Sequence, residues 1–297
     1  MMLGGNGMER KEFYQIEKLS ERAYRITSDE GVFCELLVGD EKAMLIDTTY
    51  GIGDLHSTIR SITDKPLTIV CTHGHVDHTS GNCQFSEPVY LSEDDMDLCR
   101  QHNSKKQRSF TVQDMSDKLD FITGTRSNVL PEDFDREYYL SQTEGELIPL
   151  EEGKDFDLGG ITIETIKTPG HTKGGMSFYY KEEGWLYCGD AFSFFIWLFD
   201  KDSTDRKTYL QGLDKAIALG PKRIYGGHNP NYMTLEDLKL YRRTAIEAEF
   251  EKGEPFRAPI LEVEGDIPEI RACVVDDMTM ADFGKPGFAA IVLDATR

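Results

Sequence analysis

The sequence predicts an α/β fold, and three observations lead to that prediction. Short strands separated by polar turns follow one another from about residue 12 to residue 48. A helix and a further strand come next, and that strand ends at a cluster of histidines. Strands, a helix and a strand that ends in polar residues recur after residue 153. Two similar halves of this kind suggest a duplicated βα layout in one domain.

The first half begins with strands that carry alternating or continuous apolar residues, and their short spacing predicts an antiparallel meander. These strands are expected at residues 13–18, 22–27, 32–38 and 43–47. A helix is expected at about 53–63, because Leu55, Ile59 and Ile62 share one face. A buried β-branched strand at 66–71 then leads directly into the histidine cluster.

The least regular part of the chain, at about 92–145, is predicted to be an insertion lying over or beside the functional site. Ser92 and Asp95 are spaced to cap a short helix that would run to about Gln101. Residues 101–108 form a basic island in an acidic chain. This island could contact an anionic substrate, but a solvated helix end is the favoured interpretation.

The second half repeats the strand pattern and adds two longer helices. Strands are expected at residues 155–158, 161–167, 176–180, 184–190 and 222–225. Helices are expected at about 205–219 and 234–252, the second of them with Thr234 and Asp237 as a capping box. The tail has strand-like runs near 270–275 and 288–293. We therefore expect a single domain over 1–297, with a core at about 12–250 and a C-terminal extension at about 255–297.

Composition limits the classes of partner. The chain has 297 residues, 39% of them hydrophobic, and a net charge of −20, which disfavours nucleic acid and anionic lipid as partners. No apolar run reaches the roughly 18 to 20 residues that a membrane span needs. The start lacks the order of a signal peptide, and the six cysteines are scattered without a Cys-x-x-Cys pair. We expect a cytoplasmic protein with a small-molecule substrate, and a homo-oligomer is compatible with these data.

Residues of the types that bind metals follow four separate predicted strands. They are His73, His75, Asp77, His78, His171, Asp190 and His228. Imidazole and carboxylate are the donors that zinc prefers in the absence of thiolate. Seven donors are too many for one tetrahedral ion but suit two ions that share a carboxylate. A His-rich surface loop is the ordinary alternative, and it does not explain why the later strands end in the same residue types.

These motifs resemble those of the metallo-β-lactamase-fold hydrolase superfamily, in its glyoxalase II and lactonase-like branch. The resemblance rests on Thr-His-Gly-His-Val-Asp-His at 72–78, Thr-Pro-Gly-His at 168–171, Gly-Asp at 189–190 and Gly-His at 227–228. It implies a four-layer αββα sandwich of two mixed β-sheets flanked by helices. It also implies that one metal is held by His73, His75 and His171 and the second by Asp77, His78 and His228. In this scheme Asp190 bridges the two metals, and Asp47 supports the loop from behind the ligands.

By the same resemblance, the expected function is that of a dinuclear metal-dependent hydrolase in which a hydroxide between the metals attacks a small ester, thioester or lactone. The two ions are expected to be zinc, with iron and manganese as alternatives. Asp77 would orient the nucleophile, or would serve as a metal ligand only. No cysteine stands among the motif residues, which disfavours a true lactamase, and Gly174-Gly175 replaces a Gly-His pair common in the branch.

The sequence leaves two other functions open. The first is a mononuclear iron dioxygenase that acts on persulfides, and the second is a metal-stabilised binding protein without enzymatic activity. The substrate contacts are unknown. The aromatic run at 191–199 could line a substrate pocket, belong to the core or form a dimer contact.

Overall fold

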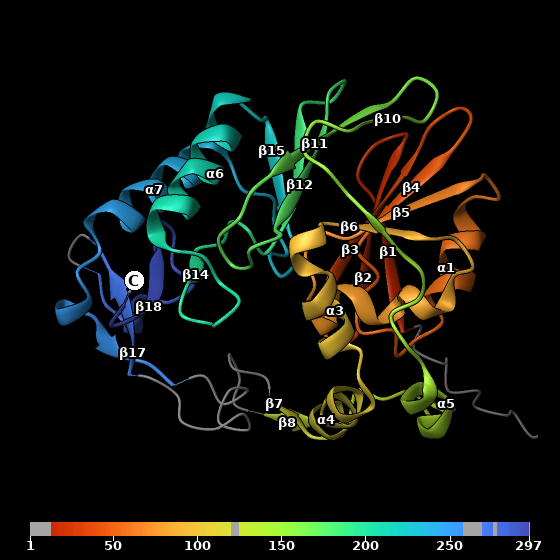
Figure 1. Cartoon of the computed structure of the whole chain (residues 1–297), viewed down its shortest axis with the longest axis horizontal. Coiled ribbons are helices and arrows are strands. Elements are labelled where there is room, and N and C mark those ends of the chain that lie inside the picture. The colour runs from red at the N-terminus through yellow and green to blue at the C-terminus, as the bar shows by residue number, and fades with distance from the viewer. Residues whose placement is uncertain (1–12, 120–124, 258–268, 276–277, 297) are drawn as a thin grey trace, which may run out of the picture.

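Two mixed β-sheets face each other in the computed structural model, and helices cover their outer faces (Figure 1). The structure describes residues 13–119, 125–257, 269–275 and 278–296. The extreme N-terminus, on which the signal-peptide argument rested, lies outside these ranges. From left to right, Figure 1 shows α6 and α7, the second sheet, the first sheet, and then α1. The predicted αββα sandwich is confirmed.

The first sheet has seven strands in the order β1-β2-β3-β4-β5-β6-β9. Strands β1 to β4 form the predicted antiparallel meander, and β4, β5, β6 and β9 run parallel to one another. The bounds are Tyr14–Lys18 for β1, Ala23–Ser28 for β2, Phe33–Val38 for β3, Ala43–Ile46 for β4, Leu67–Val70 for β5, Val89–Leu91 for β6 and Leu147–Pro149 for β9.

The second sheet has five strands in the order β10-β11-β12-β13-β15. Its hairpins are antiparallel, but β13 and β15 are parallel, because α6 connects them as a crossover. The bounds are Asp155–Asp157 for β10, Thr162–Lys167 for β11, Met176–Tyr180 for β12, Trp185–Gly189 for β13 and Arg223–Gly226 for β15.

The helices that cover the sheets have the predicted apolar faces. Helix α1, Leu55–Ile62, buries Leu55 and Ile59 against the first sheet. Helices α6, Arg206–Ala218, and α7, Leu235–Glu247, pack on the second sheet. Helix α7 begins with the predicted capping box between Thr234 and Asp237. Within the described residues, no helix is both long enough and apolar enough to cross a membrane.

The two sheets are joined by a continuous apolar layer. Met44, Ile46 and Val70 of the first sheet belong to the same buried cluster as Phe178 and Tyr187 of the second. Phe178 has no exposed surface, and neither has Ile46. Since protein interiors are packed about as densely as organic crystals, this layer fixes the position of one sheet relative to the other.

The segment at 92–145 contains short elements and one helix of twelve residues. They are the 3₁₀ turn Glu93–Asp95, α3 at Met96–His102, α4 at Lys105–Ser116, β7 at Lys118–Leu119, β8 at Arg126–Ser127 and α5 at Arg136–Ser141. The predicted capping by Ser92 and Asp95 is wrong, because the Ser92 side chain makes no cap hydrogen bond and the Asp95 carboxylate points elsewhere. The basic island is only partly solvated, since Arg108 is fully buried and donates to the Asn103 side chain at 2.7 Å.

The C-terminal extension contains the predicted strands, which form a sheet with part of the aromatic run. In this sheet the order is β14-β18-β17-β16, with β14 at Phe195–Trp197, β16 at Glu254–Pro255, β17 at Ile270–Val274 and β18 at Ala290–Asp294. Strand β14 pairs in parallel with β18, and Phe192, Ile196 and Leu198 are buried in the core. Most of the aromatic run is therefore core rather than the lining of a pocket.

The capping box of α7 gives a prediction about stability. Replacing Thr234 by Ala leaves an N–H group of the first turn without its acceptor, and we expect a loss of about 1 kcal/mol in the free energy of unfolding. The matched control is Thr234→Ser, which keeps the hydroxyl and is expected to stay within a few tenths of the parent. Urea unfolding followed by circular dichroism measures both. Equal stability of the two variants would contradict the cap.

Candidate metal centre

The seven predicted donors are brought together where strands of both sheets end. Strand β5 leads into His73, His75 and α2, Val76–Thr79, which carries Asp77 and His78. His171 follows β11, Asp190 follows β13 and His228 follows β15. They form two groups, one of His73, His75 and His171 and the other of Asp77, His78, Asp190 and His228, each with one donor atom per residue within 4.8 Å of the others.

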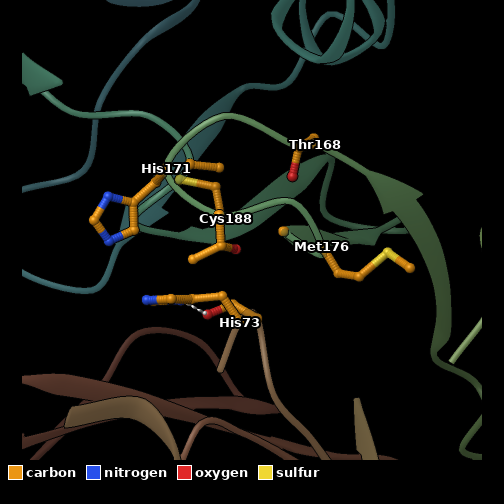
Figure 2. A pocket seen from close by; sticks show the side chains of 9 residues that line it. His73, Thr168, His171, Met176 and Cys188 are labelled. Carbon is orange, nitrogen blue, oxygen red and sulfur yellow. Dashed lines mark hydrogen bonds between the residues drawn. The ribbon is translucent and has the colours of Figure 1, made fainter. Parts of the chain in front are cut away.

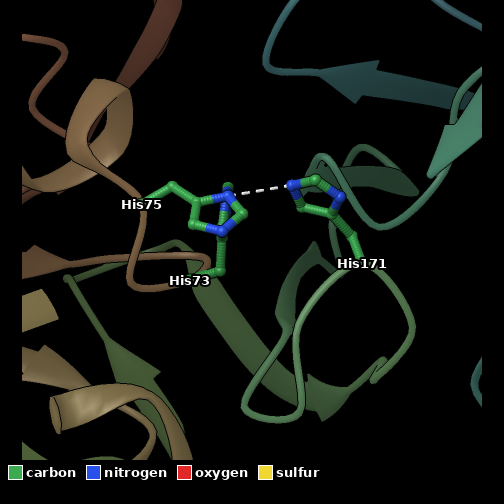
Figure 3. Close-up of side chains that lie close together, drawn as sticks. All are labelled: His73, His75 and His171. Carbon is green, nitrogen blue, oxygen red and sulfur yellow. Dashed lines mark hydrogen bonds between the residues drawn. The ribbon is translucent and has the colours of Figure 1, made fainter. Parts of the chain in front are cut away.

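The first group consists of three imidazole rings whose nitrogens converge (Figure 3). The His75 Nδ1 atom lies 3.1 Å from His73 Nε2 and 2.9 Å from His171 Nε2. Burial and the neighbouring imidazoles hold the pKa of His73 and of His75 well below the ordinary value. These two rings are therefore neutral at pH 7, which is the state in which imidazole binds a metal ion.

The second group alternates imidazoles and carboxylates. His228 Nε2 lies 3.1 Å from Asp77 Oδ2 and 3.2 Å from Asp190 Oδ2, and His78 Nε2 lies 3.5 Å from Asp190 Oδ1. Although burial acts to lower it, the pKa of His228 is raised to about 10 by Asp190 and Asp77. The pKa of His78 is also raised, against its burial, by the carboxylates of Asp77, Asp190 and Asp47.

Asp190 lies between the two groups. Besides its contacts in the second group, its Oδ2 atom is 3.7 Å from His171 Nε2 of the first. Burial opposes ionisation of this carboxyl, but His228 and His78 hold its pKa well below the usual range. It is therefore an anion placed beside donors from both groups, as a shared ligand would be.

The residues fit two metal ions on two further observations. The Nε2 atom of His78 is buried and has no hydrogen-bond partner, which is costly unless another ligand occupies it. A Cβ atom at Gly227 would lie 2.5 Å from His78 Cε1 and 2.7 Å from Asp190 Oδ1, so the backbone comes as close to the donors as a glycine allows. Neither group contains a cysteine.

Asp47 supports the first loop from behind. Its carboxylate accepts hydrogen bonds from the Thr72 backbone N–H at 2.7 Å and from the Thr72 hydroxyl at 2.8 Å. Its Oδ2 atom also lies 2.8 Å from His78 Nδ1. This contact leaves the other nitrogen of the ring, Nε2, to face the second group. Asp47 thus contacts both the start of the first loop and a donor of the second group.

The backs of the first-group rings border a small recess (Figure 2). Thr168, Met176 and Cys188 line it together with His73 and His171. The Thr72 hydroxyl lies 3.1 Å from His73 Nδ1 and so holds that ring from behind. The recess is too narrow to accept a substrate.

Sequence reasoning missed two residues, of which His102 contacts a donor and Arg25 supports a loop that carries one. His102, expected to have an ordinary surface role, stacks on His75 at a centroid distance of 4.9 Å, and its Nδ1 accepts from the Val76 N–H at 3.2 Å. Arg25 is 1% exposed and donates to the carbonyl of Gly226 at 2.6 Å, two residues before His228. Local sequence carries no signal for Arg25, because its partner lies 201 residues away.

Comparisons with known proteins agree with this geometry. The family described as "Metallo-beta-lactamase superfamily" matches residues 28–89 and 105–228. The probable metallo-hydrolase YqgX of Bacillus subtilis is 25% identical over 204 residues, which are 65% of this chain and 83% of that protein. The acyl-coenzyme A thioesterase MBLAC2 of Homo sapiens is 26% identical over 188 residues, which are 58% of this chain and 62% of that protein.

Among solved structures, a metallo-beta-lactamase from Pontibacter korlensis superposes with a TM-score of 0.56 and 17% identity. The superposition covers 79% of this chain and 99% of that one. At this level of identity the likeness concerns the fold alone. The predicted resemblance to the superfamily is confirmed by the family match and the relatives together.

The two groups should differ in the protons that they release when they bind zinc. At pH 7 the raised pKa of His78 and His228 keeps both rings protonated, so zinc must displace about two protons from the second group. His73 and His75 have lowered pKa and give up none. The zinc affinity of the second group should therefore fall up to about 100-fold for each unit of decreasing pH below neutrality, and His73 and His75 should add no such dependence to the first group. Calorimetric zinc titrations in buffers of different ionisation enthalpy measure the protons directly. Equal proton release in both steps would contradict the assignment.

Proposed function

The chain belongs to the metallo-beta-lactamase superfamily, and from that premise we propose that it is a two-metal hydrolase that cleaves a small ester, thioester or lactone. The relatives support hydrolysis as the class of reaction. The type of bond that is cleaved and the class of substrate are proposed beyond what the relatives support.

The observation that carries the proposal is the division of seven donors into two groups around Asp190. Three imidazoles serve one position, and two imidazoles with Asp77 serve the other, while Asp190 reaches both. A single metal position would use only one of these two sets. Imidazole and carboxylate donors without thiolate favour zinc, and they also accept iron or manganese.

Two divalent ions held there would supply a nucleophilic hydroxide at neutral pH and would polarise the carbonyl oxygen of the substrate. The residues of the chain would hold these ions and determine the side from which a substrate reaches them. His73 and His78, which are 3% and 0% exposed, form the floor of the centre, whereas the His228 side chain is 45% exposed. A substrate therefore approaches from the His228 side.

Asp77 is the candidate for orienting the nucleophile. His78 and His228, acting against burial, hold the pKa of this carboxyl below its usual range, so it stays ionised. An ionised carboxylate accepts a hydrogen bond from an attacking hydroxyl and fixes its direction. The same atoms also suit Asp77 as a metal ligand without any further role, and its Oδ2 lies 3.1 Å from His228 Nε2.

A thioester is supported as one of the three substrate classes by the relative named as an acyl-coenzyme A thioesterase. Because that relative is 26% identical over 58% of this chain, the likeness does not choose among the three. The metals polarise the carbonyl in the same way in each class, and the leaving group is the part that differs.

A substrate screen with parallel metal analysis tests the proposal. Thioesters, lactones, esters and phosphodiesters are offered to the protein, and the metal content of each preparation is measured. Hydrolysis of a carbonyl compound with two metals per chain is the expected result. One iron per chain with dioxygen consumption on a persulfide would establish the dioxygenase instead, and bound metals without turnover of any compound would establish a binding protein.

Replacing His73 by Ala should lower kcat/KM on the best substrate by on the order of 10³-fold, because the Lewis-acid contribution of the first metal is worth several kcal/mol. The control is His56→Ala, since His56 packs on Phe85 outside both groups and its loss should leave turnover unchanged. Circular dichroism verifies that both variants are folded. Retention of full activity by His73→Ala would refute the proposed centre.

A further inference from the structure

Asp95 is a buried carboxylate that ties together the two loops of the first group. It is 1% exposed and lies at the start of α3, where it was expected to cap the helix. Its Oδ2 atom accepts hydrogen bonds from the Gly74 N–H at 3.0 Å and from the Thr172 hydroxyl at 2.7 Å. Its Oδ1 atom accepts from the Gly174 N–H at 2.7 Å. Both oxygens are therefore used, and they serve two different loops.

The partners of Asp95 are adjacent to the donors of the first group. Gly74 stands between His73 and His75, and Thr172 follows His171 directly. The two loops start from different sheets, and Gly74 and Thr172 are almost 100 residues apart in the sequence. A single carboxylate thus connects the loop of His171 to the loop of the other two imidazoles.

Close packing around Asp95 leaves little freedom for this arrangement to shift. A Cβ atom at Gly174 would lie 2.6 Å from Asp95 Oδ1, and one at Gly74 would lie 2.7 Å from the Asp95 carbonyl oxygen. Contacts below 3.0 Å are not tolerated by an ordinary side chain, so both loops need glycine at these positions. Gly174 is one of the pair at 174–175 that departs from the related groups, and its contact with Asp95 is a physical reason for a glycine there.

Stability alone does not account for such a group. In the part of the chain that the structure describes, no lysine or arginine forms an ion pair with Asp95, and its three donors are all neutral. Burying a carboxylate without a cation is costly even when it is hydrogen-bonded. The two loops could be joined more cheaply by an apolar contact, but an apolar contact fixes distance and direction less strictly than three hydrogen bonds.

We propose that Asp95 is a positioning residue for the first metal position, which holds the His73 and His75 loop at the separation from His171 that one ion requires. This inference rests on the proposed two-metal centre and adds a residue to it that neither binds metal nor touches substrate. Residues that orient metal ligands in this way typically contribute 10- to 100-fold to metal affinity.

The test measures zinc affinity rather than turnover. Protein loaded with zinc is equilibrated against graded concentrations of a chelator, and zinc per chain is determined by mass spectrometry. In Asp95→Asn an amide N–H₂ replaces one acceptor and opposes a loop N–H donor. We expect one of the two zinc affinities to fall about 10- to 100-fold and the other to stay unchanged. The same series in a His228→Ala background, which lacks a donor of the second group, assigns the weakened zinc to the first.

Matched variants distinguish an effect of Asp95 on loop position from an effect of its charge and from a general loss of folding stability. Asp94→Asn removes the same charge one residue away, where the carboxylate pairs with Lys167 at the surface, and it should change neither affinity. Thr172→Val deletes the hydroxyl at almost constant volume and should weaken the same zinc as Asp95→Asn, whereas Thr172→Ser restores the hydrogen bond and the affinity. The thermal midpoint of the metal-free proteins reports any general loss of stability.

Unchanged zinc affinities in Asp95→Asn, or equal weakening of both zincs, overturn the inference and leave the proposed function standing. A lower thermal midpoint with unchanged affinities overturns it in favour of a role in folding only. A parent protein that binds no zinc, iron or manganese overturns both proposals. Two zincs with the predicted pattern but no hydrolysis contradict the proposed function alone.

Discussion

The packing of the two sheets against each other is the constraint on which the centre depends. Four of the seven donors follow β5 of the first sheet, and three follow β11, β13 and β15 of the second. Neither sheet holds a complete set, since His171 is needed by the first group and Asp77 and His78 by the second. The apolar layer that contains Ile46, Val70 and Phe178 therefore does more than bury surface, because any slip between the sheets would separate the donors.

The apolar layer fixes the positions of the donor-bearing loops only approximately, and directional hydrogen bonds fix them more closely. Asp47 fixes Thr72 and the His78 ring within the first sheet, and Arg25 reaches across to the Gly226 carbonyl of the second. The guanidinium of Arg25 lies over the Phe33 ring at 3.8 Å, and the Phe33 N–H donates to Gly227 at 3.0 Å. The loop before His228 is thus held from the opposite sheet, as the His171 loop is held by Asp95. Apolar contacts bring the donor-bearing loops close together, and buried hydrogen bonds fix the orientation of their side chains.

Features that depend on residues close together in the sequence could be predicted from it, whereas contacts between residues far apart in the sequence could not. Strands β4, β5 and β13 were readable because apolar runs ended in Asp47, His73 and Asp190, and α7 was readable because its capping box spans three residues. Asp95 was misread for the same reason: a Ser-x-x-Asp spacing has a local meaning, and its real partners are 21 to 79 residues away. Arg108 belonged to an apparent surface island, yet its partners Ser80 and Thr143 bury it. Long-range polar pairing leaves no periodic trace in a sequence.

The same distinction explains why the region at 92–145 was difficult to interpret. Its beginning is part of the centre, through Asp95 and the His102 ring that stacks on His75. Further along, Val112, Met115 and Tyr139 form a small apolar cluster with Ile52 of the first half, and Arg108 lies over the Tyr139 ring. A segment that only covered the entrance could move without affecting the metal ligands. The segment at 92–145 does more than that, because α3 begins directly after Asp95, whose carboxylate is hydrogen-bonded to both loops. The proposed role of Asp95 therefore makes the separation of His75 from His171 depend on where the start of α3 packs.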